Sequence, residues 1–214
     1  QQLHNFCAVD LSAFYFDMRK DVLYCDSFDS LRRRATRTVL DILFNSLTTW
    51  LAPILCFTAE EAWQARVKNS KDSVHLKTFM EIPKDWNNKK LAQKWDLIRD
   101  VRKVVTGALE IERAEKRIGS SLQAKPTVYL TSDAVAALEG LDAADIFITS
   151  GVTLVESEPP ANAFTLEEVA GVGVVQGSAD GTKCERCWKI LPEVGANNEP
   201  VCDRCADALK HNGS

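Results

Sequence analysis

The feature that most constrains this chain is a group of four cysteines near its C-terminal end. Cys184 and Cys187 form one pair, and fourteen residues separate them from a second pair, Cys202 and Cys205. Two residues between thiolates let each pair hold a metal ion as a tight knuckle, and two knuckles complete the tetrahedral four-sulfur shell that Zn²⁺ prefers. The spacing therefore predicts one structural zinc with these four cysteines as ligands.

Two other uses of such cysteines stay open: a rubredoxin-like iron site and a pair of redox dithiols. A closed four-thiolate shell leaves no position for water, so we expect it to hold structure and not to perform hydrolysis. The tail contains almost no apolar core of its own, so the metal would be what folds it.

The other three of the seven cysteines, Cys7, Cys25 and Cys56, are scattered through the first quarter of the chain. A secreted, oxidised protein tends to pair all its thiols, so an odd count with one tight cluster favours a reducing compartment. Apolar sequence neighbours predict that Cys7 and Cys56 are buried as small hydrophobic side chains.

Composition and charge narrow the class of protein. The 214 residues are 45% hydrophobic and 26% charged, as in soluble globular proteins. Charge interrupts every apolar run well before the roughly 18 residues that a membrane span needs. The chain opens at Gln1 without a secretory signal, so we expect it to be cut from a longer protein.

The charge is unevenly distributed. Residues 68–125 contain fourteen Lys or Arg against eight Asp or Glu, whereas residues 126–182 contain nine acids and no Lys or Arg. The basic stretch could face a polyanion, and nucleic acid would repel the acidic third. The alternative is that both stretches are simply solvated faces.

Apolar residues recur every three or four positions in the first part of the chain, which predicts helices. The first runs from Leu3 to about Asp17. The second is long, with Asp29 or Ser30 as its N-cap and Pro53 at its end.

A third helix is predicted to start at Thr58, where Thr58 and Glu61 fit a capping box. Residues 68–88 lack periodicity and are expected to form a connecting excursion. A fourth helix of about 27 residues follows and closes at Gly119. Four antiparallel helices would form a bundle.

After Gly119 the pattern becomes that of a small α/β module. A short helix is predicted at 133–138, and the predicted strands are 127–130, 146–148, 152–155 and 172–175. The predicted fold class is therefore mainly α, with a helical domain at 1–119, the acidic α/β module at 120–178 and the cysteine tail at 179–214.

A run of arginines is the second candidate site. Arg32, Arg33, Arg34 and Arg37 lie in the predicted second helix, with Arg33 and Arg37 one turn apart on one face. Forked guanidinium groups suit phosphate oxygens. The alternative is the solvated face of an amphipathic helix, with the arginines paired locally to Asp29 and Asp41. The sequence has neither a GxGxxG nor a Walker motif, and its three histidines lie in unrelated surroundings, so no catalytic residue is predicted.

Three stretches together resemble the C-terminal half of bacterial isoleucyl-tRNA synthetases: FYFDMRKD with LYC within 14–25, WLAPILCFTAEEAW at 50–63, and KCERCW at 183–188. The stretch RIGSSLQA at 117–124 fits too, although the family commonly has Glu where this chain has Gln123. Valyl and leucyl relatives share the helical segment, whereas the cysteine tail distinguishes the isoleucine enzymes.

The resemblance implies a class I synthetase with its catalytic and editing domains upstream, followed by an anticodon-binding domain and a zinc-bearing module. The family's two ATP motifs are absent, so the chain should bind tRNA without charging it, and ATP and Mg²⁺ would serve only the full-length parent. The expected partner is tRNA(Ile), with no DNA and no membrane. We expect a cytoplasmic monomer.

Trp188, next to a knuckle, has two possible uses: packing over the thiolates or stacking on an unpaired base. Stacking is favoured because the tail has few apolar side chains and because basic neighbours could hold phosphates. The candidate tRNA contacts are Arg32, Arg33, Arg34, Arg37, Lys183, Arg186, Trp188 and Lys189.

Two rival functions remain. Formamidopyrimidine-DNA glycosylases also end in a four-cysteine zinc finger, which would make the ligand DNA, but their N-terminal catalytic Pro and helix-two-turn-helix are not visible here. The other rival is a zinc-stabilised protein-interaction module that binds no nucleic acid.

Overall fold

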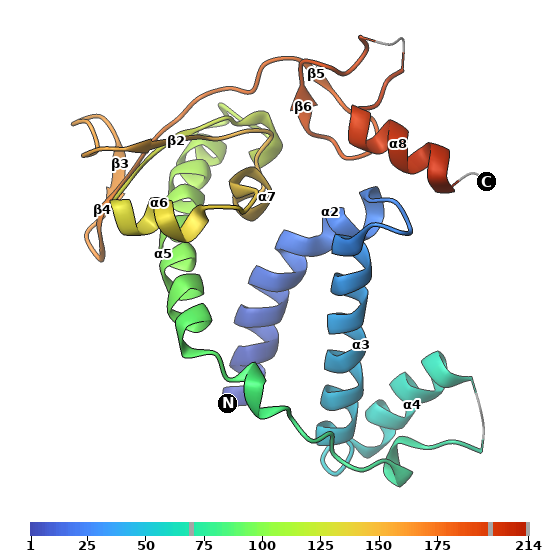
Figure 1. The fold of residues 1–214 in the computed structure, drawn as a ribbon. Helices are drawn as coiled ribbons and strands as arrows, with labels where there is room; N and C mark the ends of the chain where they lie inside the picture. The colour runs from blue at the N-terminus through green and yellow to red at the C-terminus, as the bar shows by residue number, and fades with distance from the viewer. Residues whose placement is uncertain (69–70, 197–198, 213–214) are drawn as a thin grey trace. The chain divides into compact units, whose positions relative to one another are not determined.

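The computed structural model describes residues 1–68, 71–196 and 199–212, and the chain forms two compact units (Figure 1). Unit 1 combines Gln1–Ser27 with Asn88–Ser214, and unit 2 is the intervening segment Phe28–Asn87. Among the described residues, no helix is both long and apolar enough to span a membrane.

Unit 1 begins with one continuous helical run. It consists of α1 (Gln2–Asn5), the π-helical segment η1 (Phe6–Phe16) and α2 (Asp17–Cys25). The first predicted helix is present but extends to Cys25 instead of ending near Asp17, because Asp17 itself keeps helical dihedral angles. Extended backbone at Asp26 ends the run.

The fourth predicted helix is α5 (Lys89–Ala114), capped by the side chain of Asn88. Its buried face includes Ile98, Val101 and Val105. The helix ends before the predicted Gly119, because Lys116 adopts a left-handed conformation that closes the last turn. A short 3₁₀ helix, η4 (Ser121–Gln123), leads into the sheet.

The α/β part of unit 1 is a four-stranded sheet in the order β2-β1-β4-β3, in which only β1 and β2 pair in parallel. Its face against α5 shares one hydrophobic core with that helix and with Met18 of α2 (Figure 1). The strands are β1 (Thr127–Leu130), β2 (Thr153–Glu156), β3 (Phe164–Leu166) and β4 (Val169–Val175).

Strands β1, β2 and β4 confirm three of the four predicted strands, and the predicted short helix is α6 (Ser132–Leu138). The strand predicted at 146–148 is wrong, because these residues lie in and just after α7 (Ala143–Phe147). Asp142 caps this helix at the Asp145 amide, and a three-residue apolar run does not distinguish a strand from a helix. Strand β3 was not predicted.

The tail of unit 1 contains a two-stranded hairpin and a helix. The hairpin is formed by β5 (Thr182–Lys183) and β6 (Ile190–Leu191), and the helix is α8 (Asp203–Asn212). The first cysteine pair lies between the two strands of the hairpin, and the second pair lies at the start of α8.

Unit 2 contains α3 (Leu31–Leu51), α4 (Cys56–Val67) and two 3₁₀ turns, η2 (Val74–Leu76) and η3 (Lys84–Trp86). Its core consists of Ala52, Ala59, Trp63 and Val74, with Phe44 and Val67 packed against it. Residues 69 and 70 of the predicted excursion lie outside the described residues.

Ser30 accepts a hydrogen bond from the Arg33 amide, which confirms the predicted cap of α3. The capping box predicted at Thr58 is wrong, because α4 already begins at Cys56 and has no side-chain cap. The chain is mainly helical with small sheets, as predicted. Two of the long predicted helices lie in each unit, and both the single four-helix bundle and the boundaries at 119 and 178 stay predictions.

Candidate metal centre and nucleic-acid interface

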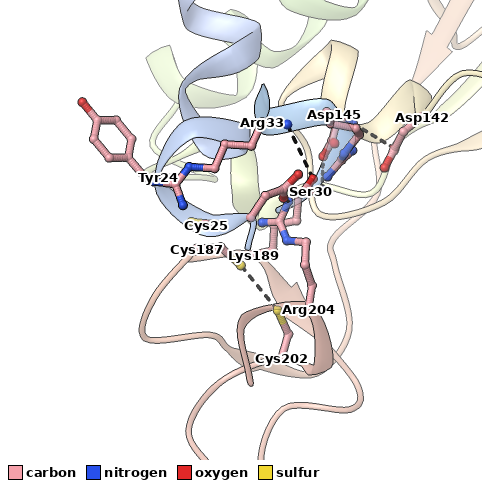
Figure 2. A network of polar contacts seen from close by, with 12 residues as sticks. Tyr24, Cys25, Ser30, Arg33, Asp142, Asp145, Cys187, Lys189, Cys202 and Arg204 are labelled. Carbon is pink, nitrogen blue, oxygen red and sulfur yellow. Dashed lines mark hydrogen bonds and ion pairs between the residues drawn. The ribbon is translucent and has the colours of Figure 1, made fainter. Parts of the chain in front are cut away.

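The structure brings together the four cysteines that the spacing singled out. All four are buried, and their sulfur atoms lie within 4.8 Å of one another. Cys187 Sγ lies 3.7 Å from Cys202 Sγ, as the dashed line in Figure 2 shows. Cys184 and Cys187 come from the turn of the β5–β6 hairpin, whereas Cys202 directly precedes α8 and Cys205 lies in its first turn.

Backbone hydrogen bonds shape the first knuckle. The Cys184 amide donates to the Lys189 carbonyl, and the Trp188 amide donates back to the Cys184 carbonyl, both at 2.9 Å. This tight turn requires Trp188 to adopt a left-handed conformation with φ of 66°. The Cys202 amide donates to Cys184 Sγ at 3.3 Å, which ties the second knuckle to the first.

The donor set fits a tetrahedral zinc ion. Four sulfur atoms at about 2.3 Å from a central zinc lie roughly 3.8 Å apart, close to the separation between Cys187 and Cys202. The amide of Cys202 points at the sulfur atom of Cys184, where it can donate to a metal-bound thiolate. A zinc ion with four thiolates carries two net negative charges, and burying them requires nearby positive charge.

Arg204 supplies such a charge beside the sulfur atoms. Within the described residues its Nη2 atom is buried without a hydrogen-bond partner, and its Nη1 atom lies 3.6 Å from Asp26. Burial opposes the charged form, but attraction to Cys187 in its thiolate form and to the carboxylates of Asp145 and Asp26 raises the pKa of Arg204. Arg204 Nη2 is therefore placed to donate a hydrogen bond to a negatively charged metal centre formed by these thiols.

In the absence of metal, Cys187 and Cys202 hold their protons firmly. A hydrogen bond with Cys205, followed by burial, raises the pKa of Cys187 to about 12. Burial is also the main cause that raises the pKa of Cys202. A metal ion binding here must therefore displace protons from the sulfur atoms.

Basic side chains of the tail attach it to the rest of unit 1. The guanidinium of Arg186 donates to the carbonyls of Tyr24 and Cys25, at 2.7 and 2.5 Å, and so caps the C-terminal end of α2. Lys189 Nζ lies 2.6 Å from Asp145 Oδ1, and both side chains are almost fully buried (Figure 2). The amide of Ile190 donates to Ser150 Oγ at 2.7 Å.

The candidate RNA contacts in the tail therefore differ in their surroundings. Arg186 and Lys189 are engaged within unit 1, and their predicted RNA contacts stay predictions. Lys183 is exposed, and Trp188 has 61% of its surface exposed, with Lys183 Nζ 5.4 Å from the ring centre. The indole thus lies largely in solvent, and packing over the thiolates does not account for its position.

The arginines of unit 2 lie in the first two turns of α3. Arg32, Arg34 and Arg37 are exposed, whereas the guanidinium of Arg33 lies 4.4 Å above the ring of Phe28. Arg34 and Arg37 are three residues apart and share a face of the helix. The first turn of α3 contains no acidic residue.

The structure changes the interpretation of the scattered cysteines. Cys56 is exposed and Cys7 is half-buried, so the predicted burial is wrong for Cys56, which lies at the exposed start of α4. Cys25, which received no role from the sequence, is buried in the same cluster as the four tail cysteines. No local sequence signal could have shown this, because the two segments are distant along the chain.

Comparison with known protein families agrees with this arrangement. Residues 1–128 match the family described as the anticodon-binding domain of tRNA ligase, and residues 181–208 match the zinc finger found in FPG and IleRS. The first match covers more than half of the chain. The chain therefore belongs to the anticodon-binding domain family of tRNA ligases.

Curated relatives narrow the resemblance to one enzyme. Over 97% of the length of this chain, the sequence is 54% identical to the isoleucine--tRNA ligase of Agrobacterium fabrum. Over 96% of this chain, it is 55% identical to the isoleucine--tRNA ligase of Ruegeria pomeroyi. The isoleucine--tRNA ligase of Brucella abortus is 51% identical over 97% of this chain. The chain spans only 21 to 22% of the length of these relatives.

Proposed function

We propose that this chain is the tRNA-binding C-terminal part of an isoleucine--tRNA ligase, an enzyme that attaches isoleucine to tRNA(Ile) with ATP and Mg²⁺. The observation that carries the proposal is the combination, in one chain, of the anticodon-binding family over 1–128 with a buried four-cysteine cluster at the zinc-finger match. The chain would recognise the anticodon arm of the tRNA through an antiparallel helical bundle. The protein would be a cytoplasmic monomer, and aminoacylation would take place in other domains of the full-length enzyme.

The four cysteines would hold one structural zinc. The metal would replace the protons of four buried thiols and fix the two knuckles in one geometry. The residues of this chain do the rest: Arg204 balances the negative charge, and Arg186 and Lys189 hold the tail to α2 and α7.

The start of α3 supports a phosphate contact. Arginines at a helix N-terminus lie at the positive end of the helix dipole, where each costs up to about 1 kcal/mol relative to an acidic residue. Arg32, Arg33 and Arg34 nevertheless occupy three positions of the first turn, which itself contains no acidic residue. A polyanion bound at this end would offset that cost, and we infer that Arg34 and Arg37 contact the RNA backbone while Arg32 and Arg33 add to the positive potential.

The tail offers a second contact. Trp188 and Lys183 place an exposed aromatic ring beside an exposed ammonium group. An unpaired base could stack on the free ring face while the ammonium group meets a phosphate. Stacking is sequence-tolerant, so this contact would add affinity more than base selection.

The test replaces Arg34 and Arg37 with Glu in the whole chain and measures binding to tRNA(Ile) by fluorescence anisotropy across a salt series. A charge-matched control replaces Lys84 and Lys89, both exposed, with Glu. We expect the Arg34→Glu/Arg37→Glu variant to bind more weakly and to lower the salt slope by about one to two units, as expected for two lost phosphate contacts.

Equal losses in the two variants would show a general charge effect and would contradict a contact at α3. Duplex DNA of the same length serves as competitor, since the zinc-finger family also includes FPG proteins. Preference for DNA, or no salt-dependent binding of RNA by the unmodified chain, would refute the proposed function.

A further inference from the structure

A fifth cysteine lies against the predicted metal centre. Cys25 is the last residue of α2, has only 4% of its surface exposed, and belongs to the same buried cluster as Cys184, Cys187, Cys202 and Cys205. Its sulfur atom lies 3.9 Å from the carbonyl of Arg186, inside the first knuckle. Helix α2 thus contributes a thiol to a site that the sequence assigns to the tail alone.

Among the four predicted ligands, Cys205 is the one whose side chain interacts with that of Cys25. Cys187 instead pairs with Cys202, at 3.7 Å between their sulfur atoms. Cys25 is therefore next to the sulfur atom at one corner of the site. Arg186 also fixes the backbone of Cys25 by donating to its carbonyl at 2.5 Å.

Ordinary hydrophobic packing does not explain this position well. Besides the cysteines, the cluster contains Val194, with Leu191 and Val201 at its edge, so the surroundings of Cys25 are mostly sulfur. Zinc has no geometric preference of electronic origin, so exchange of one thiolate for a neighbouring one changes its coordination little.

We propose that Cys25 is a reserve metal ligand, which takes the place of Cys205 when that thiolate is lost and completes a four-sulfur site with Cys184, Cys187 and Cys202. With Cys25 as a ligand, the metal would bind a thiolate at the C-terminal end of α2 and would so connect this helix to the tail. This inference rests on the structural zinc of the proposed function, but not on RNA binding.

The experiment compares three variants of the whole chain: Cys205→Ser, Cys25→Ser/Cys205→Ser, and Cys56→Ser/Cys205→Ser. The last is a matched control, because it also removes a second thiol but takes it from an exposed position. Zinc content is measured by elemental analysis, and zinc affinity by competition with a chromophoric chelator. Amide signals of the β5–β6 hairpin report whether the tail is folded.

We expect Cys205→Ser and the Cys56→Ser/Cys205→Ser control to retain one zinc per chain. The Cys25→Ser/Cys205→Ser variant should bind zinc at least about tenfold more weakly, because only three cysteines remain. In cadmium-substituted Cys205→Ser, NMR should show coupling between the metal and the β protons of Cys25. This coupling identifies the ligand independently of affinity.

Equal zinc affinities for Cys205→Ser and Cys25→Ser/Cys205→Ser, including the case in which neither folds its tail, would overturn the proposal. Cadmium bound to Cys205→Ser without coupling to Cys25 would overturn it as well. A lack of zinc in the unmodified chain would instead refute the structural zinc, so the two failures are distinguishable.

Discussion

The backbone of Trp188 allows a prediction in which two substitutions differ by a single carbon atom. Trp188 has a φ of 66°, a region in which a side chain costs about 1 to 2 kcal/mol and glycine costs nothing. Trp188→Ala and Trp188→Gly remove the same indole, so its partial burial cancels in the comparison. The difference between the two variants then reports the backbone alone.

The expected difference in stability between the two variants is small, and it favours Trp188→Gly. Glycine gains the full relief of the left-handed conformation but loses about 0.5 to 1 kcal/mol through its larger freedom in the unfolded chain. Trp188→Gly should therefore be more stable than Trp188→Ala by about 0.5 to 1 kcal/mol. Because folding of the tail is coupled to zinc binding, this corresponds to roughly two- to fivefold tighter zinc in the glycine variant.

Two assays test this argument. Chelator competition measures the zinc affinity of both variants, and anisotropy measures their binding to tRNA(Ile). Both variants should lose about 1 to 3 kcal/mol of RNA affinity if the ring stacks on a base. Equal or tighter zinc binding by Trp188→Ala would refute the conformational argument, and unchanged RNA affinity in both variants would refute stacking.

Two further predictions concern carboxyl and amide groups. Gln123 accepts hydrogen bonds from the amides of Gly119 and Ser120, so Gln123→Glu should stabilise the chain by about 0.5 to 1 kcal/mol at pH 7 through charge-assisted bonds; an unchanged melting temperature would contradict this. Hydrogen bonds from Gln64, then from Ser73, lower the pKa of Glu60. Glu60 therefore stabilises unit 2 above its ordinary pKa of 4.5, and this stabilisation is lost as the pH falls through the lowered pKa. Hydrogen exchange at the Val74 amide, which donates to Glu60, should accordingly be faster in Glu60→Gln at pH 7, and unchanged protection would contradict the role of this carboxylate.

Long periodic segments were predicted well, whereas short ones were not. The pattern over residues 91–109 identified α5, because one apolar face of a helix this long leaves a strong signal. Residues 146–148 were assigned to a strand, although the cap at Asp142 makes them part of a helix and its end. Strand β3 has three residues, and its pairing with β4 decides its conformation.

The sequence by itself determined the local chemistry: two Cys-x-x-Cys pairs, the arginine turn of α3 and an indole next to a knuckle. Each of these depends on residues close together in the chain, so spacing alone is sufficient to find them. Only the tertiary structure decided what surrounds them. Cys25 joins the cysteines of the tail, and Lys189 pairs with Asp145, because folding brings distant segments together and excludes water from between them. Buried charges and thiols must find partners there, and those partners lie far away in the sequence.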